Sequence, residues 1–387
     1  MKGDPRKRGF STRAVHAGQA PEPVTGAVAV PIFQTSTYVH PGLGESKGFD
    51  YARTTNPTRT ALEENVAALE GGHRGHAFAS GMAAISTLMT LVHADDHAVF
   101  SANVYGGTYR FIEQVLDRYR VRATWVDTTD LQAVQDALQE STKLVFLESP
   151  TNPMMEVTDI AAVAELASTV SATVAVDNTF MSPYFQQPLD LGANVVVHST
   201  TKFLNGHSDS IGGVLVTDSE ELSDWFAFVQ KSAGGILSPF DAFLTMRGIK
   251  TLGVRMERHE SNANAVARYL DQHGKVAAVH YPGLEAFPGH GLQRQQSTGF
   301  GAMISFEVET FERAKTVLDA FEVFSLAESL GGVESLACHP GSMTHASVPA
   351  ERRAELGIGD GLVRLSVGIE DEADLLDDLG QALDRLD

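Results

Sequence analysis

The chain is organised around the stretch Asn194-Val-Val-Val-His-Ser-Thr-Thr-Lys-Phe-Leu-Asn-Gly-His-Ser-Asp-Ser-Ile-Gly-Gly213. It opens with a β-branched apolar run, Val195 to Val197, which predicts a buried strand. The strand ends in hydroxyl residues and then Lys202, and a polar loop leads to a second strand near Val214. Sites on α/β sheets usually lie at such strand ends. A buried lysine loses its charge more easily, so Lys202 is either an amine nucleophile or base, or a lysine of a surface loop.

The composition is that of a globular protein large enough for two domains. The chain has 387 residues, 43% of them hydrophobic, and a mean hydropathy of −0.08. No apolar run approaches the roughly 20 residues that a membrane-spanning helix needs. The basic N-terminus is not followed by the apolar segment of a secretory signal, so we expect a cytoplasmic protein.

Charge and cysteine content exclude several classes of function. The net charge of −20 and the pI near 5.0 disfavour nucleic acid and anionic membranes as partners. The single cysteine, Cys338, excludes an intrachain disulfide and a four-cysteine zinc site, and we interpret it as an incidental small residue. His93 and His97 have metal-like spacing but span a helix end and a turn, so we predict no metal site.

Between His76 and about residue 247 the sequence alternates between strands and helices. This alternation predicts a mostly parallel, doubly wound sheet with helices on both faces, in a large domain of residues 51–247. The predicted strands are 76–80, 97–101, 122–126, 143–148, 173–176, 195–198 and 213–216, and the predicted helices are 83–92, 108–118, 130–139, 159–168 and 218–230.

The two ends of the chain follow other patterns. Residues 1–50 are rich in Gly, Pro and Thr, so we predict an irregular arm that contacts a neighbouring subunit, with a short extended piece at 28–33. A helix follows from Pro57 to Gly71. Residues 248–387 predict a smaller α+β domain, with a long helix at 251–273, strands at 277–281, 302–308, 323–327 and 362–367, and helices at 312–320 and 371–386.

Two strand ends carry groups that suit a phosphate. Ser80-Gly-Met82 lies between a strand and a helix, where free N–H groups and the helix dipole favour an anion. Ser199 and Thr201 add hydroxyl donors close to Lys202. The P-loop and G-x-G-x-x-G patterns are absent, so the phosphate would belong to a cofactor other than ATP or a dinucleotide. On its own, Ser80-Gly-Met82 fits an ordinary strand-to-helix turn equally well.

Other strand ends carry an acid, a tyrosine and an amide. Asp177 directly follows an apolar strand. An acid in this position is a metal ligand, a helix cap or the partner of a pyridinium nitrogen. Tyr105, followed by Gly106-Gly107, either stacks on a flat ring or fills the core. Asn152 lies in the polar segment after the strand that ends at Glu148.

One arginine lies inside a predicted strand. Arg364 interrupts the apolar segment 362–366 and therefore needs an anion. The anion is either a substrate carboxylate, which a guanidinium binds with two hydrogen bonds, or a structural Asp or Glu.

Taken in order, these motifs resemble the cystathionine γ-synthase and γ-lyase family, the Cys/Met-metabolism group of pyridoxal 5′-phosphate (PLP) enzymes of fold type I. The resemblance covers essentially the whole chain. It rests on Tyr51-Ala-Arg-Thr-Thr-Asn-Pro-Thr58, Ala79-Ser-Gly-Met82, Val104-Tyr-Gly-Gly-Thr108, Ser149-Pro-Thr-Asn-Pro153, Val176-Asp-Asn-Thr-Phe180, His198-Ser-Thr-Thr-Lys-Phe-Leu-Asn-Gly-His-Ser-Asp209 and Met343-Thr-His-Ala-Ser347.

The resemblance implies a role for each candidate residue. Lys202 would bind PLP covalently and move protons, and Tyr105 would stack on the ring and act as acid or base at the leaving group. Other residues would contact the cofactor: Asp177 and Thr179 at the ring nitrogen, Gly81, Met82, Ser199 and Thr201 at the phosphate, and Tyr51 and Arg53 at the phosphate of a neighbouring subunit. The substrate carboxylate would bind Asn152, Ser329 and Arg364, with Glu328 near the distal amino group of cystathionine. The contacts between subunits imply a homodimer and, as in the family, a homotetramer.

The implied reaction is γ-elimination on cystathionine, which gives cysteine, 2-oxobutanoate and ammonia. The alternative is cystathionine γ-synthase, which replaces the acyl group of an O-acyl-homoserine with cysteine. Methionine γ-lyase is less favoured, because those enzymes usually have cysteine at the position of Gly107. Asp50 stands where lyases of animal type often have glutamate, and the stretch Cys338–Met343 resembles methionine γ-lyases and bacterial synthases. A non-catalytic PLP-binding protein and a dinucleotide oxidoreductase fit these motifs less well.

Overall fold

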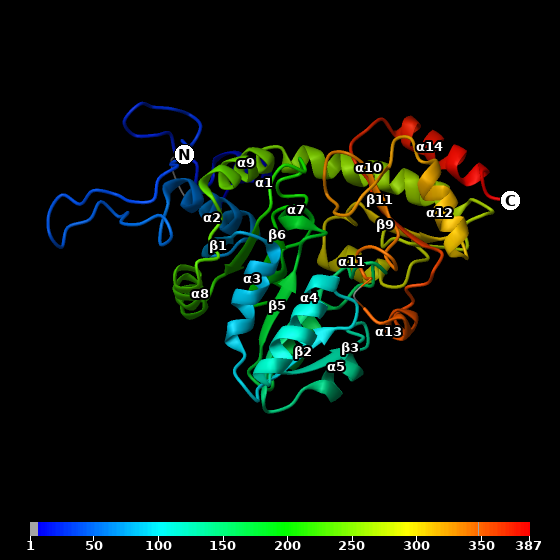
Figure 1. The fold of residues 1–387 in the computed structure, drawn as a ribbon, viewed down its shortest axis with the longest axis horizontal. Coiled ribbons are helices and arrows are strands. Elements are labelled where there is room, and N and C mark those ends of the chain that lie inside the picture. Colours follow the sequence, from blue (N-terminus) through cyan, green and yellow to red (C-terminus); the bar gives the residue numbers. More distant parts are fainter. Residues whose placement is uncertain (1–6, 347) are drawn as a thin grey trace.

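The computed structural model describes residues 7–346 and 348–387. Ser347, the last residue of the predicted motif at 343–347, and the first six residues of the predicted arm lie outside the described residues. The described chain forms a large sheet of mostly parallel strands and a second, smaller sheet, each with helices packed on it (Figure 1). This is the predicted fold class. None of the described helices is both long and apolar enough to cross a membrane.

Seven strands form the large sheet in the order β1-β7-β6-β5-β4-β2-β3, and only β7 runs antiparallel to its neighbours. The strands β2 and β7 are buried along their whole length and β4 at every residue except Lys143, which is why they contain apolar runs rather than alternating residues. The strands are β1 (Arg74–Phe78), β2 (His97–Ser101), β3 (Arg122–Val126), β4 (Thr142–Glu148), β5 (Thr173–Asp177), β6 (Val195–Ser199) and β7 (Gly213–Thr217).

Helices cover both faces of this sheet. Phe100 and Leu215 pack on one face with α3 (Gly81–Leu88), the turns after α4 (Gly106–Phe111) and α8 (Glu220–Ala233). On the other face, Val99 packs with α5 (Leu131–Ala137) and α6 (Ile160–Ser168), and Val196 packs with α2 (Pro57–Glu70) and α9 (Pro239–Ile249). Burial on both faces leaves the strand ends as the places where polar side chains gather.

The smaller sheet has the order β10-β11-β12-β9-β8, and its strands come from the last third of the chain. They are β8 (Ala278–His280), β9 (Met303–Glu307), β10 (Ser325–Leu326), β11 (Leu336–Cys338) and β12 (Leu362–Ser366). The helices α10 (Leu252–Asp271), α12 (Phe311–Ala320) and α14 (Glu372–Asp384) contact it or one another. Short helices complete the described chain at α7 (Ser182–Phe185), α11 (His290–Gln296) and α13 (Ala350–Glu355).

The N-terminal segment differs from the predicted irregular arm. Residues Phe10–His16 form a helix, α1, that packs against α2 and α10 of its own subunit. The side-chain amide of Asn65 donates hydrogen bonds to the carbonyls of Arg13, Ala14 and Ala17, at 3.2, 3.4 and 2.9 Å. The predicted extended piece at 28–33 contains no strand. Beyond α1, the chain up to about residue 50 extends away from the body as two long loops (Figure 1).

Some predicted boundaries shift for local reasons. The first strand is Arg74–Phe78 rather than 76–80, because Ser80 caps α3 by accepting a hydrogen bond from the N–H of Ala83 at 3.0 Å. The predicted helix 108–118 begins at Gly106 and changes after Phe111 into a π-helical turn, Ile112–Leu116, and a 3-10 turn, Asp117–Tyr119.

Candidate active site

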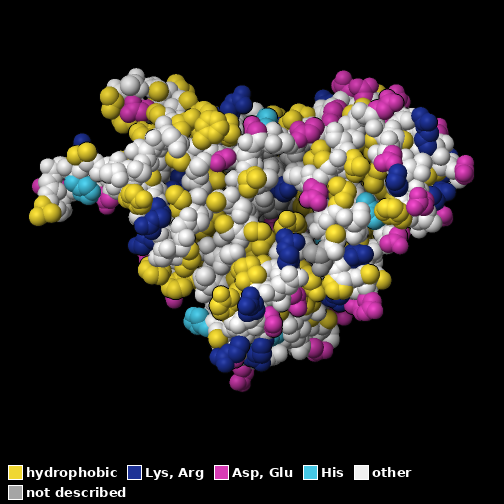
Figure 2. Space-filling view, in the orientation of Figure 1, with side chains coloured by type: hydrophobic (Ala, Val, Ile, Leu, Met, Phe, Trp, Pro, Cys, Tyr) yellow, Lys and Arg dark blue, Asp and Glu magenta, His cyan; other side chains and the backbone are white. Residues whose placement is uncertain are grey.

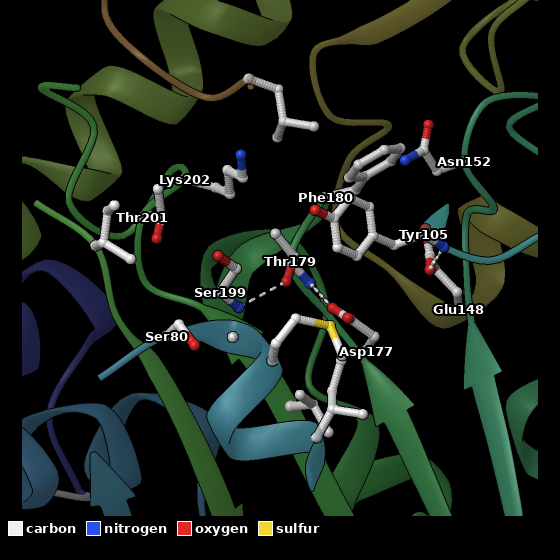
Figure 3. Close-up of a pocket in the computed structure, with 16 residues that line it drawn as sticks. Ser80, Tyr105, Glu148, Asn152, Asp177, Thr179, Phe180, Ser199, Thr201 and Lys202 are labelled. Atoms are coloured by element: carbon white, nitrogen blue, oxygen red, sulfur yellow. Dashed lines mark hydrogen bonds between the residues drawn. The ribbon is translucent and has the colours of Figure 1, made fainter. Parts of the chain in front are cut away.

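A cavity opens at the carboxyl ends of the adjacent parallel strands β4, β5 and β6 (Figure 3). Each of these strands contributes its last residue to the cavity wall, namely Glu148, Asp177 and Ser199. Nine of the candidate residues predicted from the sequence line it: Gly81, Met82, Tyr105, Asn152, Asp177, Thr179, Ser199, Thr201 and Lys202. The sheet therefore brings together side chains that are up to 121 positions apart, from Gly81 to Lys202.

Lys202 extends into this cavity from the turn after β6 (Figure 3). Its Nζ donates a hydrogen bond to Oγ of Ser329 at 2.6 Å. Burial and the nearby positive charge of Arg364 lower the pKa of Lys202 to about 8, although Glu328 and Cys338 oppose the shift. A substantial fraction of the amine is therefore neutral near physiological pH, as a nucleophile requires.

Asp177 is held by a short chain of hydrogen bonds. Its Oδ1 accepts the backbone N–H of Thr179 at 3.0 Å, and Oγ1 of Thr179 accepts the backbone N–H of Ser199 at 2.9 Å. Burial raises the pKa of Asp177, while hydrogen bonds from Thr179 and the charge of His198 lower it. A cation placed against this carboxyl group would keep it ionised.

The helix α3 points its first turn at the cavity. Ser80 caps this helix, and Gly81 and Met82 follow at the positions whose N–H groups have no acceptor within a helix. A Cβ atom on Gly81 would lie 3.1 Å from Cβ of Ser199, so the close approach of the helix to β6 suits glycine. This turn and the hydroxyls of Ser199 and Thr201 form a group of donors suited to a phosphate.

Tyr105 reaches into the cavity from the start of α4 (Figure 3). Its backbone N–H donates to Oε2 of Glu148 at 2.9 Å. A Cβ atom on Gly107 would lie 2.4 Å from Cε1 of the tyrosine ring, so any side chain at position 107 would force the ring to move. Tyr105 is 43% exposed and therefore faces an open space rather than filling the core.

The predicted pair of Asn152 and Arg364 lies next to Lys202. Nη1 of Arg364 donates to Oδ1 of Asn152 at 2.8 Å, and Nη2 donates to the carbonyl of Ser329 at 3.1 Å. Among the residues that the structure describes, no Asp or Glu forms an ion pair with Arg364. A buried guanidinium whose hydrogen bonds include these two neutral oxygens, and which has no ion-pair partner there, retains the capacity to bind a carboxylate.

Ser329 connects this pair to the lysine. Its backbone has φ = 90°, a conformation that residues other than glycine rarely adopt. In this conformation its Oγ meets Lys202 while its carbonyl meets Arg364. Strained backbone of this kind is common at functional sites.

Five of the predicted residues do not line the cavity of their own chain: Ser329 and Arg364, described above, and Tyr51, Arg53 and Glu328. Tyr51 and Arg53 are exposed in a segment before α2, where the guanidinium of Arg53 lies 5.4 Å from the centre of the Tyr51 ring and bonds to the carbonyl of Lys231. Glu328 is exposed and directly precedes Ser329, and its negative charge acts on the pKa of Lys202.

Several residues of the cavity were not singled out as site residues from the sequence. Apolar residues of the lining carry no sequence signal that separates them from the core: Ile85, Phe180, Val197, Ile211 and Leu330. Glu148 is different, because it ends a buried strand in the same way as Asp177 and thus carried a usable signal.

These residues fit PLP. A lysine with a lowered pKa, a buried acid, a tyrosine ring and a phosphate-binding helix turn lie around one cavity, and Gly81 keeps this turn close to Ser199. PLP needs each of these partners: an amine for its aldehyde, an acid for its ring nitrogen and donors for its phosphate. The fit is to a phosphorylated pyridine rather than to a dinucleotide, whose glycine fingerprint is absent.

The lowered pKa of Lys202 predicts how cofactor capture depends on pH. Only the neutral amine attacks the aldehyde of PLP, so the capture rate of the cofactor-free protein should rise with pH and level off above about 8. Stopped-flow absorbance after mixing with PLP measures this rate. A rate that keeps rising up to pH 10 would mean that Lys202 retains its ordinary pKa.

Comparison with known proteins agrees with this site. The family model for Cys/Met metabolism PLP-dependent enzymes matches residues 11–384. A cystathionine γ-lyase from Bacillus subtilis is 51% identical, with 97% of this chain and 99% of the relative covered. A cystathionine γ-synthase from Mycobacterium tuberculosis is 53% identical, with 97% of each covered. A cystathionine β-lyase from Lactococcus lactis is 47% identical, with 97% and 99% covered.

The fold matches solved structures equally well. The structure described as metB from Corynebacterium glutamicum superposes with a TM-score of 0.97 at 47% identity, with 100% of both chains covered. The names of these relatives thus divide among a γ-lyase, a γ-synthase and a β-lyase of cystathionine. The chain belongs to the Cys/Met metabolism family of PLP-dependent enzymes.

Proposed function

We propose that the protein is a cystathionine γ-lyase, which converts cystathionine and water into cysteine, 2-oxobutanoate and ammonia. The observation that carries this proposal is the placement of opposite charges around Lys202. Arg364 is buried and has no ion-pair partner among the described residues. Glu328, which directly precedes Ser329 in the sequence, is exposed. Cystathionine has an amino-acid group at each end, so it offers a carboxylate to Arg364 and a distal ammonium to Glu328.

Substrate orientation follows from these contacts. Arg364 and Asn152, joined at 2.8 Å, would hold the α-carboxylate, and the position of Ser329 between Arg364 and Lys202 would place Cα within reach of the amine. Bound PLP supplies the electron sink that makes the Cα proton acidic. Lys202 would then accept the Cα proton as the base, since its lowered pKa leaves the amine neutral for part of the time.

Two other residues would act on charge and protons. Asp177 would hold the proton on the pyridine nitrogen, because an ionised carboxyl group favours a cation beside it. Tyr105 would donate a proton to the departing sulfur of the cysteine half. Its ring reaches the cavity opposite Lys202 (Figure 3).

Product analysis tests the proposal. The purified enzyme, loaded with PLP, is given L-cystathionine alone, and the thiol and keto acid products are separated by liquid chromatography. We expect cysteine and 2-oxobutanoate in equal amounts. Homocysteine and pyruvate would instead identify a β-lyase, and no turnover without an O-acyl-homoserine and cysteine would identify a synthase.

Cystathionine γ-synthase is the second candidate. The mycobacterial synthase is as similar to this chain as the bacillary lyase, at 53% and 51% identity. The lyase and the synthase need the same contacts to cystathionine. They differ in the last step, in which the lyase uses water and the synthase uses the thiol of cysteine. Methionine γ-lyase remains disfavoured, because those enzymes usually have cysteine where this chain has Gly107. A cysteine at this position would also displace the ring of Tyr105 from its observed place.

Replacing Arg364 with lysine tests the carboxylate contact. Lysine keeps the charge but loses the planar pair of donors, and a hydrogen bond to a charged group contributes about 1.5–3 kcal/mol, so KM for cystathionine should rise about tenfold to hundredfold. The rate kcat should change less. Steady-state kinetics measures both, with the surface variant Arg118→Lys as the control. An unchanged KM would remove Arg364 from substrate binding.

We further propose that the enzyme works as an oligomer, a homotetramer as in the family resemblance, in which Tyr51 and Arg53 reach the phosphate site of a neighbouring subunit. Neither residue lines the cavity of its own chain. The projecting segment before them carries exposed apolar side chains, such as Val24 and Val39, which are 88% and 91% exposed. Figure 2 shows apolar side chains in yellow on the projecting part of the molecule. Burial of such side chains against a second copy would stabilise the assembly. Light scattering of the purified protein tests the proposal, and a monomer would contradict it.

We also propose domain boundaries at residues 50 and 247 and a cytoplasmic location. The division at 247 falls between the last strand of the large sheet, β7, and the first strand of the smaller sheet, β8. Limited proteolysis that released fragments with other ends would argue against these boundaries.

A further inference from the structure

Two carboxyl groups stand side by side in the cavity wall. Glu148 ends β4 and Asp177 ends β5, and the parallel register pairs these two residues directly. Paired residues of neighbouring strands point to the same face of a sheet, and both residues line the cavity (Figure 3). Asp177 has an assigned role at the ring nitrogen, whereas Glu148 has none. Glu148 is only 5% exposed, so its presence next to another acid is costly unless it has a partner.

The partner of Glu148 is the main chain of Tyr105. Its Oε2 accepts the backbone N–H of Tyr105 at 2.9 Å. No side chain caps the helix that begins after Tyr105, so Glu148 provides the acceptor from outside that helix. Two residues earlier, the amide of Asn103 donates to Oε2 of Glu156 at 2.7 Å. The loop that carries Tyr105 is thus fixed at two points to the segment that begins at the end of β4.

The pair of acids favours one charge rather than two. Burial and the negative charge of Asp177 raise the pKa of Glu148 well above its usual range, against the hydrogen bonds from Tyr105 and Asn152 and the charge of Arg364. Burial also raises the pKa of Asp177, although hydrogen bonds from Thr179 and the charge of His198 oppose this shift. Burial and proximity thus disfavour two negative charges at these strand ends, while the 2.9 Å contact makes Glu148 the acceptor for the N–H of Tyr105.

We propose that Glu148 is a positioning residue, a hydrogen-bond acceptor that fixes the main chain of Tyr105 so that the phenol stays in the PLP cavity. The inference rests on the PLP dependence of the family and on the assignment of Tyr105 to the cofactor. It holds whether the protein is a lyase or a synthase.

Two conservative variants separate this role from a need for negative charge. Glu148→Gln keeps the length and offers an amide oxygen to Tyr105, but it cannot ionise. Glu148→Asp keeps the carboxyl group but is one methylene too short to keep the 2.9 Å contact. Titration of the cofactor-free proteins with PLP, followed by visible absorbance and circular dichroism, compares them without any substrate. Glu140→Gln, on the surface, is the matched control.

We expect Glu148→Asp to bind PLP about tenfold more weakly than Glu148→Gln, the loss of roughly one hydrogen bond. The circular dichroism of the bound cofactor should change in Glu148→Asp alone. If Glu148→Asp does not fold, as judged by thermal unfolding of the cofactor-free protein, Glu148→Ala takes its place in the comparison. Equal affinities, or a greater loss in Glu148→Gln, would overturn the proposal, because the charge or the bulk of Glu148 would then matter instead.

A second background tests whether Glu148 acts through Tyr105. The same pair of substitutions is made in a Tyr105→Ala protein, where there is no phenol to position. We expect the difference between Glu148→Asp and Glu148→Gln to disappear there, since the two positions are coupled. A difference that persists would show that Glu148 acts on the cofactor by another route and would overturn the proposal. Absence of PLP binding by the unmodified protein would contradict the cofactor assignment, a separate result.

Discussion

Replacing Lys202 with alanine should abolish turnover, with kcat reduced by about 10⁴-fold or more, while the fold stays intact. Lys202 is the one residue assigned both the covalent bond to PLP and the transfer of the Cα proton, and a single positioned acid or base already contributes about 10²–10⁴-fold. The variant removes a buried amine whose pKa is lowered, so it relieves a desolvation cost rather than creating one. Product formation from L-cystathionine measures the rate, and circular dichroism in the far ultraviolet checks the fold.

The control for this variant is Lys143→Ala, an exposed lysine on β4. It removes the same charge and side chain far from the cavity, so activity should remain at the level of the unmodified enzyme. Turnover by Lys202→Ala within tenfold of that level would refute the mechanism, because no other lysine lines the cavity in the part of the chain that the structure describes.

Replacing Asp177 with asparagine should reduce kcat by about 10²–10³-fold, the typical effect of losing one preorganised electrostatic contact in an active site. The amide has the same shape and can keep the contact to the N–H of Thr179, now 3.0 Å from Oδ1. It cannot hold a proton on the ring nitrogen, so the cofactor becomes a weaker electron sink. PLP should still bind, because Lys202 and the phosphate donors are unchanged.

Steady-state kinetics and a PLP titration together check this expectation. Asp224→Asn, an exposed residue that pairs with Arg74, is the matched control. If the variant binds PLP more weakly but keeps its kcat when saturated with PLP, Asp177 serves only to bind the cofactor and does not contribute to the chemical step.

The parallel sheet and much of the cavity were predictable because their signals are local. Strands 97–101 and 122–126 were predicted with the bounds that the structure has, since each is an apolar run between polar turns. Asp177 and Lys202 follow such runs, and the carboxyl ends of neighbouring parallel strands meet at one edge. The family resemblance then assigned a role to each of these residues. The structure places these residues around one cavity. Their roles in binding and catalysis are tested by the substitutions at Lys202 and Asp177.

Other features depend on contacts that no short pattern encodes. The helix α1 is held by Asn65, whose amide donates to carbonyls 48 to 52 residues earlier, so part of the segment predicted to be irregular forms a helix. The pairing of Glu148 with Tyr105 joins residues 43 positions apart. Glu148 ends a buried strand, a signal that was available but not used, and only the register of β4 and β5 reveals that it lies beside Asp177.

The site of covalent attachment tests the central claim most directly. The purified protein with PLP is reduced with borohydride, which fixes the cofactor on its lysine, and then digested and analysed by mass spectrometry. The account predicts a yellow protein that loses its colour on reduction, with one pyridoxyl group per chain on the peptide that contains Lys202. A colourless protein without an adduct, or an adduct on another lysine such as Lys231 or Lys250, would contradict it.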